Sequence, residues 1–429
     1  PSLDHLDTVI DLAAPDQRVW AQVIHVTSRG EQPLFISRDY TPTQGRADFW
    51  PASTIKMYTA TATLELINQA GFSIDATLGF QRLIEGEWVE EVDISVREVV
   101  RRTFDCSSNE TYTLLLRFTG VDWLNTEFFT PAHGFNHTAL MRDYVTDDAR
   151  PWSYQLSEAQ RISIREGSRE VIREHQWSGR SYADERGCTI YNTRGDANCT
   201  SAGDMAEHMR RVIFHEQLPE GQRFEISAPL LDWYRGDTRE RILNNTQGDN
   251  CGGPVYSGIR RVFNQPILHH KEGLVSEYRG TMHHVHDEES NTEYVASLMI
   301  DSPSEQVIEK LSEELARMMK TPSAYVHLGY LRDYVNPITA NLVTYSEEVG
   351  TLQMMVKPYE EDGFSLEGWT PLQGTSTPID VGERSHNLRS NCLNESGQLH
   401  IRGRLETANG IVAWSDLHYV IVDHTQTCP

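Results

Sequence analysis

Residues 51–56 read Pro-Ala-Ser-Thr-Ile-Lys and open a segment of helical character that runs to about Gln69 and ends at Gly71. Ser53 and Lys56 lie three positions apart, so a helix places their side chains on one face. A serine hydroxyl becomes a good nucleophile when a neighbouring base takes its proton. A lysine is such a base if burial or nearby positive charge lowers its pKa. The stretch therefore makes Ser53 a candidate nucleophile and Lys56 its candidate activating base.

Two further motifs follow in the chain. Cys106-Ser107-Ser108-Asn109 precedes another helical pattern, and Lys271-Glu272-Gly273 opens a strand. Ser-x-x-Lys alone is common by chance. The order Ser-x-x-Lys, Ser-x-Asn, Lys-x-Gly, however, is the signature set of class A β-lactamases and penicillin-binding proteins. Residues 1–320 resemble that superfamily, and residues 198–206 look like its helix start after the omega loop.

The resemblance implies a role for each motif residue. Ser53 would attack a carbonyl carbon, and Lys56 would accept its proton. Ser107 would relay a proton to the leaving group, and Asn109 would hold a substrate amide and help orient Lys56. Lys271 would direct positive charge toward Ser107 and a substrate carboxylate. Read without the resemblance, Ser107 and Asn109 fit a helix cap, and Lys271 fits a solvated strand lysine.

The third motif also departs from the family pattern. The backbone N–H groups of Ser53 and Leu274 would form the oxyanion hole, with Gly273 beside them. The family has Thr or Ser between the lysine and the glycine, where this chain has Glu272. A glutamate in the site would repel a substrate carboxylate. Either Glu272 points away from the site, or the substrate lacks that carboxylate.

A deacylating glutamate is harder to find in the sequence. Class A β-lactamases carry one in a Glu-x-x-Leu-Asn segment, which this chain lacks. Counting back from Thr200 puts Glu185 at that place, with Thr189 where the asparagine would stand. Glu185 is therefore the candidate base, and a surface loop glutamate is the alternative. Without such a base an acyl-enzyme would hydrolyse slowly.

The stretch between the second motif and Glu185 is longer than a minimal class A enzyme has. The extra segment falls near residues 125–180. Its aromatic residues Trp152, Tyr154 and Trp177 would either line a substrate cleft or simply pack against the rest of the protein. Residues 120–200 as a whole are rich in Arg, Glu, Asn and Ser, with helical patches.

The pattern along the rest of the chain predicts an α/β fold. Alternating apolar residues predict strands, and spacing of three to four predicts helices. The expected strands are 19–29, 33–40, 271–285 and 292–301. The expected helices are 94–105, the segment after Asn109, 200–215, and an amphipathic helix opened by Pro303.

Two domains follow from this pattern and the resemblance. Residues 1–324 would form the β-lactamase/transpeptidase-like fold, an antiparallel sheet flanked by helices with a helical subdomain. Residues 325–429 hold short alternating segments broken by Gly, Pro, Asn and Ser, which is typical of a small all-β, sandwich-like domain. The role of this second domain is either placement on the cell wall or a partner, or simple structural capping.

The amino-acid composition excludes some classes of binding partner. The 429 residues carry 62 acidic and 38 basic side chains, a formal net charge of -24. Such a surface repels nucleic acid and anionic membranes. No run of about 18 apolar residues predicts a membrane span, and the start at Pro1 reads as processed. No cofactor or metal is expected, and the expected location is periplasmic or secreted.

The six cysteines fit disulfides in an oxidising compartment, because their even number comes without zinc-ligand spacing. Free buried thiols in a cytosolic protein are the alternative. In the family fold the segment ahead of the third motif runs near the second motif, which implies a Cys106–Cys251 pair. Cys188–Cys199 and Cys392–Cys428 would be the other two.

A histidine cluster adds a smaller signal. His283, His284 and His286 stand with Asp287 near an expected strand end, and His284 and His286 would share a face. They are suitable zinc ligands. A solvated hairpin tip is the favoured reading.

The sequence thus predicts a serine hydrolase that cleaves an amide or ester bond, β-lactam or D-alanyl-peptide-like, through a Ser53 acyl-enzyme. Its substrate would be a small molecule or a peptide derived from the cell wall. The alternative is a degenerate, non-catalytic protein that binds a wall peptide or a protein partner. Retention of all five motif side chains argues against decay.

Overall fold

The structure is a computed structural model that describes residues 3–27, 33–40, 49–145, 157–236, 242–243, 253–321, 323–329, 331, 334–335, 337–393 and 396–422. The chain forms two compact units. The larger holds Gln17–Tyr256 and Gln265–Ile308, and the smaller holds Pro1–Asp16, Ser257–Asn264 and Glu309–Pro429. The smaller unit thus combines helical segments from earlier in the chain with the C-terminal strands. The boundary expected at residue 324 stays a prediction.

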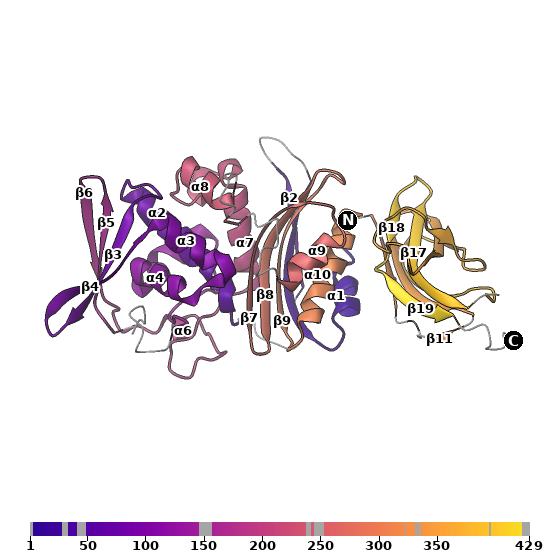
Figure 1. The fold of residues 1–429 in the computed structure, drawn as a ribbon, viewed down its shortest axis with the longest axis horizontal. Coiled ribbons are helices and arrows are strands. Elements are labelled where there is room, and N and C mark those ends of the chain that lie inside the picture. Colours follow the sequence, from indigo (N-terminus) through magenta and orange to yellow (C-terminus); the bar gives the residue numbers. More distant parts are fainter. Residues whose placement is uncertain are drawn as a thin grey trace. The chain divides into compact units, whose positions relative to one another are not determined.

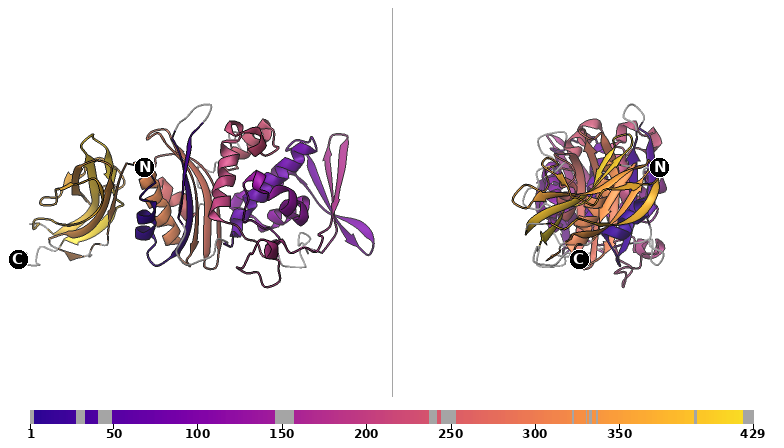
Figure 2. Two further views of the ribbon diagram at one scale, coloured as in Figure 1. Left: turned by 180° about the vertical axis from the view of Figure 1, so that it is seen from behind. Right: turned by 90° about the vertical axis from the view of Figure 1, so that its right-hand side faces the viewer.

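The larger unit is built on a five-stranded antiparallel sheet in the order β2-β1-β9-β8-β7 (Figures 1 and 2). The strands are β1 (Arg18–Val26), β2 (Phe35–Tyr40), β7 (Ile267–Val275), β8 (Tyr278–Asp287) and β9 (Thr292–Asp301). The central strand β9 is buried along nearly its whole length, as expected for a strand covered on both faces. Early and late parts of the chain meet here, with Val23 opposite Ala296.

The predicted strand 271–285 is wrong in one respect. It is two strands, β7 and β8, joined by a tight hairpin at Ser276 and Glu277. Ser276 has a φ of 48°, a left-handed conformation that serine seldom adopts and that the sequence does not announce.

Helices pack against this sheet and against one another in the larger unit. They are α2 (Ile55–Gln69), α3 (Val96–Phe104), α4 (Asn109–Thr119), α5 (Val121–Trp123), α6 (Tyr182–Glu185), α7 (Ala202–Ile213) and α8 (Ala228–Arg235). Helix α7 packs against β1, β8 and β9, while α2 packs against α4. The helices expected over 94–105, after Asn109 and over 200–215 are confirmed.

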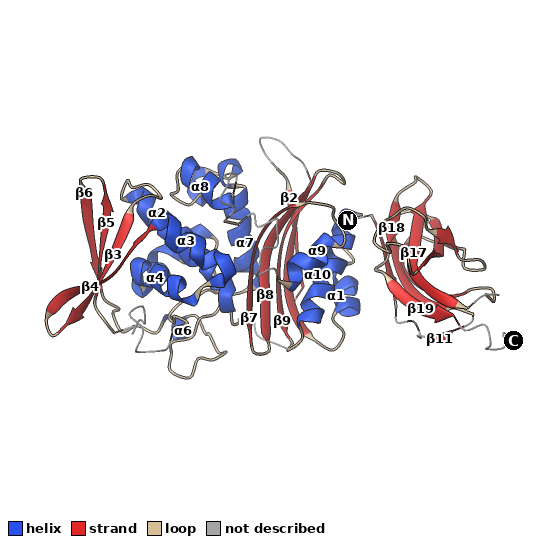
Figure 3. Ribbon diagram, in the orientation of Figure 1, coloured by secondary structure: helices blue, strands red, loops and turns tan. Residues whose placement is uncertain are grey.

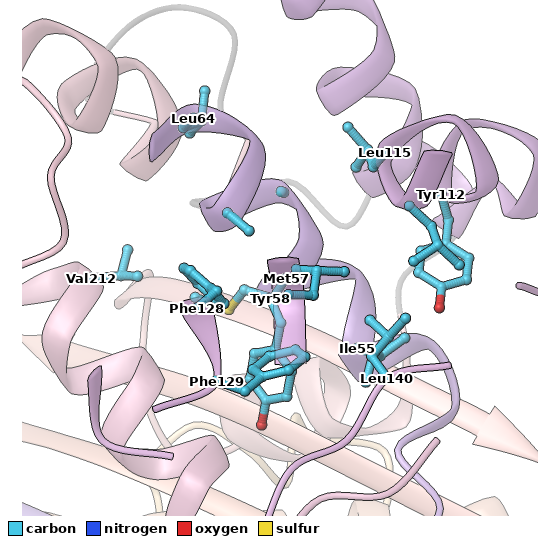
Figure 4. Packing of buried hydrophobic residues seen from close by; sticks show 14 of the residues in the cluster. Ile55, Met57, Tyr58, Leu64, Tyr112, Leu115, Phe128, Phe129, Leu140 and Val212 are labelled. Atoms are coloured by element: carbon cyan, nitrogen blue, oxygen red, sulfur yellow. The ribbon is translucent and has the colours of Figure 1, made fainter. Parts of the chain in front are cut away.

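Helix α2 runs through the middle of the core. Thirteen of its residues are buried, among them Lys56 and three threonines. Because this helix is buried on all sides, it lacks the polar face that a surface helix turns to solvent. Two of these threonines satisfy their hydroxyls on the helix itself, as Thr59 and Thr61 donate to the carbonyls of Lys56 and Met57 at 3.1 and 2.9 Å. Figure 4 shows Met57 and Tyr58 among apolar side chains from other segments, including Phe128, Phe129 and Val212.

A second, four-stranded antiparallel sheet lies in the larger unit, in the order β4-β3-β5-β6. Its strands are β3 (Thr77–Ile84), β4 (Glu87–Ser95), β5 (Gln160–Glu166) and β6 (Arg169–His175). The helical patches expected over 120–200 are therefore wrong for 160–175. Strand β6 is exposed or half-buried along its length, so it lacks the alternation of apolar and polar residues that predicts a strand.

The smaller unit contains the predicted all-β region. Its strands form a three-stranded sheet, β10-β12-β16, and a larger sheet, β11-β19-β17-β13-β14, to which β15 and β18 attach (Figure 3). They are β10 (Ala324–Leu328), β11 (Tyr334–Val335), β12 (Thr339–Ser346), β13 (Gly350–Pro358), β14 (Thr370–Pro371), β15 (Thr377–Ile379), β16 (Gly382–Arg389), β17 (Gly397–Thr407), β18 (Val412–Trp414) and β19 (His418–Val422). Inward residues such as Leu342, Leu352 and Ile401 make one core.

Three further helices complete the chain. They are α1 (Leu6–Ala13), α9 (Pro254–Arg260) and α10 (Glu305–Lys320), the last being the amphipathic helix predicted after Pro303. Within the described ranges, no helix combines the length and apolar character that crossing a membrane requires.

Candidate active site

Three elements of the larger unit bring the motif residues together. Ser53 lies in a short 3-10 turn, Ala52–Thr54, that leads into α2, and Lys56 lies in the first turn of α2. Ser107 ends a 3-10 turn, Asp105–Ser107, between α3 and α4, and Asn109 begins α4. Lys271 lies on β7. Segments far apart in the chain therefore contribute to one cluster.

Lys56 is the most deeply placed member of the cluster. Its side chain is fully buried. Its Nζ lies 2.7 Å from Asn109 Oδ1 and 3.0 Å from Ser107 Oγ, and it donates to the Ser107 carbonyl. Burial, with a smaller effect from the positive charge of Lys271, lowers the pKa of Lys56 to about 6. The amine is therefore mostly neutral at pH 7.

A neutral amine matches the groups around it. Its two N–H bonds can meet the Asn109 side-chain oxygen and the Ser107 carbonyl. Its lone pair then faces the third neighbour, Ser107 Oγ at 3.0 Å, and can accept a proton, which is what a base for Ser53 requires. None of the hydrogen bonds that the described residues give Lys56 runs to Ser53. Catalytic hydrogen bonds often form only once substrate is bound.

Ser107 links the two lysines. Its Oγ lies 3.0 Å from Lys56 Nζ and 3.0 Å from Lys271 Nζ. Its backbone has a φ of 57°, in the left-handed region that favours glycine. Strained conformations of this kind cost roughly 1–3 kcal/mol and cluster at functional sites. The turn points both the carbonyl and the hydroxyl of Ser107 at Lys56.

Lys271 is only 6% exposed, and its Nζ also donates to the carbonyl of Glu272 at 2.7 Å. Burial lowers the pKa of Lys271 to about 8. It is therefore mostly protonated at pH 7, and its positive charge lies within hydrogen-bond distance of the Ser107 hydroxyl. It is not the solvated strand lysine that was the alternative.

Strand β7 passes directly over the backbone of the Ser53 turn. A Cβ at Gly273 would lie 2.7 Å from the Pro51 carbonyl oxygen and 2.7 Å from the N atoms of Ser53 and Thr54. Only glycine permits this approach. The approach brings the backbone N–H of Ser53 beside the strand that carries Leu274, as an oxyanion hole requires.

Two tyrosines complete the site, and the sequence analysis missed both. The rings of Tyr112 and Tyr144 lie 5.9 and 6.0 Å from Lys56 Nζ. Tyr144 OH donates to the carbonyl of Ala52 at 2.8 Å. Ala52 has a φ of 46°, so this bond steadies a strained residue next to Ser53. Tyr144 lies in an irregular segment, where periodicity gives no signal.

Glu272 points away from the cluster, which decides between the two alternatives. Neighbouring side chains of a strand face opposite sides of a sheet, so Lys271 and Gly273 share one face and Glu272 takes the other. Its carboxylate accepts the backbone N–H of Tyr256, at the start of α9, at 3.3 Å. Burial raises the pKa of Glu272 to about 7. The carboxylate of Glu272 therefore lies on the strand face opposite the one from which Lys271 reaches Ser107.

This burial makes a stability prediction for Glu272→Gln. The ordinary pKa of the carboxyl is 4.5, so between about pH 4.5 and 7 the folded state holds more protons than the unfolded state. The free energy of unfolding therefore falls as pH rises through this range, by up to about 3 kcal/mol. We expect the variant to lack this fall in urea unfolding at pH 5 and pH 7.5. Equal falls in both proteins would contradict the burial of Glu272.

Glu185 does not join the cluster. Its side chain is 46% exposed and forms an ion pair with Arg180 at 2.8 Å. It ends α6, whose N-terminal cap is Ser181. The prediction that Glu185 is the deacylating base thus gains no support, and the surface glutamate that was its alternative fits this position.

The remaining sequence predictions have mixed outcomes. The Cys188–Cys199 disulfide is confirmed. Cys251 and Cys428, the predicted partners of Cys106 and Cys392, lie outside the described residues, as do Trp152 and Tyr154. Trp177 packs against the core and donates to the Arg180 carbonyl at 2.8 Å, which is ordinary packing.

The histidine cluster is not the solvated hairpin tip that was favoured. His283 and His284 are buried within β8 and face opposite sides of the sheet. His284 Nδ1 lies 3.0 Å from His269 Nδ1, and its Nε2 lies 3.2 Å from Glu293. Burial lowers the pKa of His283 to about 3, so it stays neutral. These contacts describe core histidines with local partners.

Comparison with known families decides the assignment. Residues 42–320 match the model of the β-lactamase enzyme family. The chain belongs to the β-lactamase enzyme family. The match contains all three motifs of this family member, and the fold expected from them is confirmed.

Solved structures similar to this β-lactamase family member are distant in sequence. A β-lactamase from Sphaerobacter thermophilus DSM 20745 is 13% identical, with a TM-score of 0.46, covering 74% of this chain and 97% of its own. A class A β-lactamase from Bacteroides cellulosilyticus DSM 14838 is 12% identical (TM-score 0.48, 74% and 98%). One from Chitinophaga pinensis DSM 2588 is 12% identical (TM-score 0.47, 73% and 97%). Among curated proteins none matches the sequence.

Proposed function

We propose that this protein is a serine hydrolase that cleaves an amide or ester bond, β-lactam or D-alanyl-peptide-like, through a covalent acyl-enzyme on Ser53. The observation that carries the proposal is the placement of Lys56. It is buried, has a pKa of about 6, and lies one helical turn from Ser53. Burying a lysine so that its pKa falls this far costs stability, and groups with such perturbed pKa values cluster at functional sites.

The proposed reaction begins with proton transfer from Ser53 Oγ to the Lys56 amine, while Oγ bonds to the carbonyl carbon. The negative charge then grows on the carbonyl oxygen, and the N–H groups of Ser53 and Leu274 would stabilise it. When the C–N or C–O bond breaks, the leaving atom takes the Ser107 proton. Protonated Lys56, 3.0 Å from Ser107 Oγ, returns that proton.

Deacylation has no comparable support. The candidate base Glu185 is engaged with Arg180 at the surface. Water would therefore attack the acyl-enzyme without a positioned carboxylate, so we propose slow turnover of β-lactams. The natural substrate would be a cell-wall peptide or a related small molecule, met outside the cytoplasm.

Intact-protein mass spectrometry after mixing with penicillin G tests the proposal. A single adduct of one penicillin, persisting for minutes or longer and absent from Ser53→Ala, is the expected result. Ser227→Ala is a matched control, because Ser227 also precedes a helix but contacts Asn68 at the far end of α2. Hydrolysed penicillin without an adduct would mean fast deacylation. Intact penicillin without an adduct would contradict the proposed substrate class and favour the non-catalytic alternative.

The acylation rate should have a bell-shaped pH dependence. Protonation of Lys56 below about pH 6 removes the base, so the rate rises with pH through 6. Above about pH 8, Lys271 loses the charge that would hold a substrate carboxylate, so the rate falls. Time courses of adduct formation between pH 5 and 9 would show both limbs. Glu272, whose pKa is about 7, also titrates in this range, and Glu272→Gln is the control for it. A pH-independent acylation rate would contradict the roles assigned to Lys56 and Lys271.

A further inference from the structure

A small cavity in the smaller unit has no part in the proposed reaction. Its volume is about 260 Å³, just below the usual range for small-molecule sites. Its lining combines cationic side chains with apolar ones and contains no carboxylate. The lining residues are Arg261, Val262, Arg317, Lys320, Thr321, Phe364, Leu366, Arg402, Val412 and Trp414.

Arg402 is the unusual member of this lining. Its residue is only 2% exposed, although it lies on the face of β17 opposite the core residues Ile401 and Leu405. Among the described residues its guanidinium has no hydrogen bond and no ion pair. Its Nε is buried and unpartnered, and its guanidinium carbon lies 5.6 Å from the centre of the Trp369 ring. Burial lowers the pKa of Arg402 to about 10, which still leaves it charged at pH 7.

Three carboxylates attract Arg402 electrostatically, namely Glu313, Asp416 and Asp362. Asp362 is exposed and accepts the backbone N–H of Phe364 at 2.9 Å, and the other two are paired with other cations. Glu313 pairs with Arg317 and with Arg261, the latter at 3.2 Å. Asp416 pairs with Lys310 and lies 3.0 Å from His418 Nε2. None of these carboxylates makes a hydrogen bond or an ion pair with Arg402 among the described residues, and a buried charge without such a contact is costly unless a ligand supplies it.

The apolar side of the cavity faces solvent. Phe364 and Leu366 are 52% and 53% exposed, on the loop between β13 and β14. Val412 and Trp414, from β18, form the wall beside them. An anionic group at Arg402 would therefore place an attached apolar group against these four side chains.

We propose that this cavity binds a small organic anion, a carboxylate that carries an aryl or alkyl group. The carboxylate accepts hydrogen bonds from the Arg402 guanidinium, a planar fork suited to this geometry. Lys320, which donates to the Val262 carbonyl at 2.9 Å, adds positive charge to the lining, whereas the charge of Arg317 is paired with Glu313. The cavity volume limits the ligand to about the size of an arylalkyl acid.

Ligand-observed NMR titration of the full chain with 4-phenylbutyrate tests the proposal, with 4-phenylbutanamide as the uncharged probe. We expect saturable binding of the acid near millimolar Kd and at least tenfold weaker binding of the amide. Arg402→Gln should weaken binding of the acid at least tenfold. Arg389→Gln, an exposed arginine on β16, is the matched control and should leave binding unchanged.

A second variant covers the case in which Arg402→Gln fails to fold. Leu366→Ser changes an exposed loop residue and should weaken binding of the acid severalfold without lowering the melting temperature. Ser53→Ala should bind as the parent does, which separates this cavity from the proposed catalytic site. No binding by the parent protein, equal binding of acid and amide, or equal binding by Arg402→Gln would overturn the proposal.

Discussion

Replacement of Lys56 by methionine is expected to slow acylation of Ser53 by penicillin about 10²- to 10⁴-fold, the usual contribution of a positioned general base. Methionine keeps the length of the buried chain but cannot accept the serine proton. The rate is read from the time course of adduct mass at pH 7. The same variant should also lose the rise of the rate through pH 6 that is assigned to Lys56.

Lys357→Met is the control for loss of a buried lysine. Lys357 is 4% exposed, lies in the smaller unit and donates to the Asp362 carbonyl at 2.8 Å. It should leave acylation unchanged, whatever it does to stability. A fall of less than tenfold for folded Lys56→Met would mean that another group takes the Ser53 proton.

Gly273→Ala is expected to impair both stability and acylation. The new Cβ would lie 2.7 Å from three backbone atoms of the Ser53 turn, and backbone atoms cannot swing aside as a side chain can. Overpacking of this kind costs about 1–3 kcal/mol. If β7 moves away instead, the N–H groups of Ser53 and Leu274 that we propose as the oxyanion hole separate, and loss of one such donor costs about 10²- to 10³-fold in rate.

Gly280→Ala is a closely matched control, because Gly280 pairs with Gly273 across the β7–β8 hairpin. A Cβ at Gly280 meets nothing nearer than the Leu298 carbonyl oxygen at 3.6 Å, an ordinary contact. We expect its melting temperature and acylation rate to stay near those of the parent. Thermal unfolding and adduct time courses of the two variants give the comparison, and similar behaviour would contradict the close approach at Gly273.

The sequence predicted the motif part of the site because local geometry fixes it. Helical spacing puts Ser53 and Lys56 on one face, and alternation along a strand puts Lys271 and Gly273 on one face. The same alternation would have turned Glu272 to the opposite face, had it been applied to that residue. Tyr144 was out of reach, since it reaches Ala52 from an irregular segment ninety-two positions away.

The four-stranded sheet was missed for a different reason. Strands β4 and β6 are solvated on much of both faces, so burial selects no alternating pattern in their sequences. Arg402 shows the converse case. A strand arginine ordinarily predicts a solvated face, and only the tertiary structure reveals that this one is buried.

The order of strands in the large sheet determines when this protein can complete its fold. β1 starts at Arg18, yet its partner β9 ends at Asp301. In a growing chain β1 can pair with β2 early, but its other edge lacks its partner until most of the protein has been synthesised, and Lys271 reaches the cluster only late. Pairing over such sequence distances is intrinsically slow. The nascent chain consequently cannot complete its large sheet during most of its synthesis, and the motif residues come together only at a late stage.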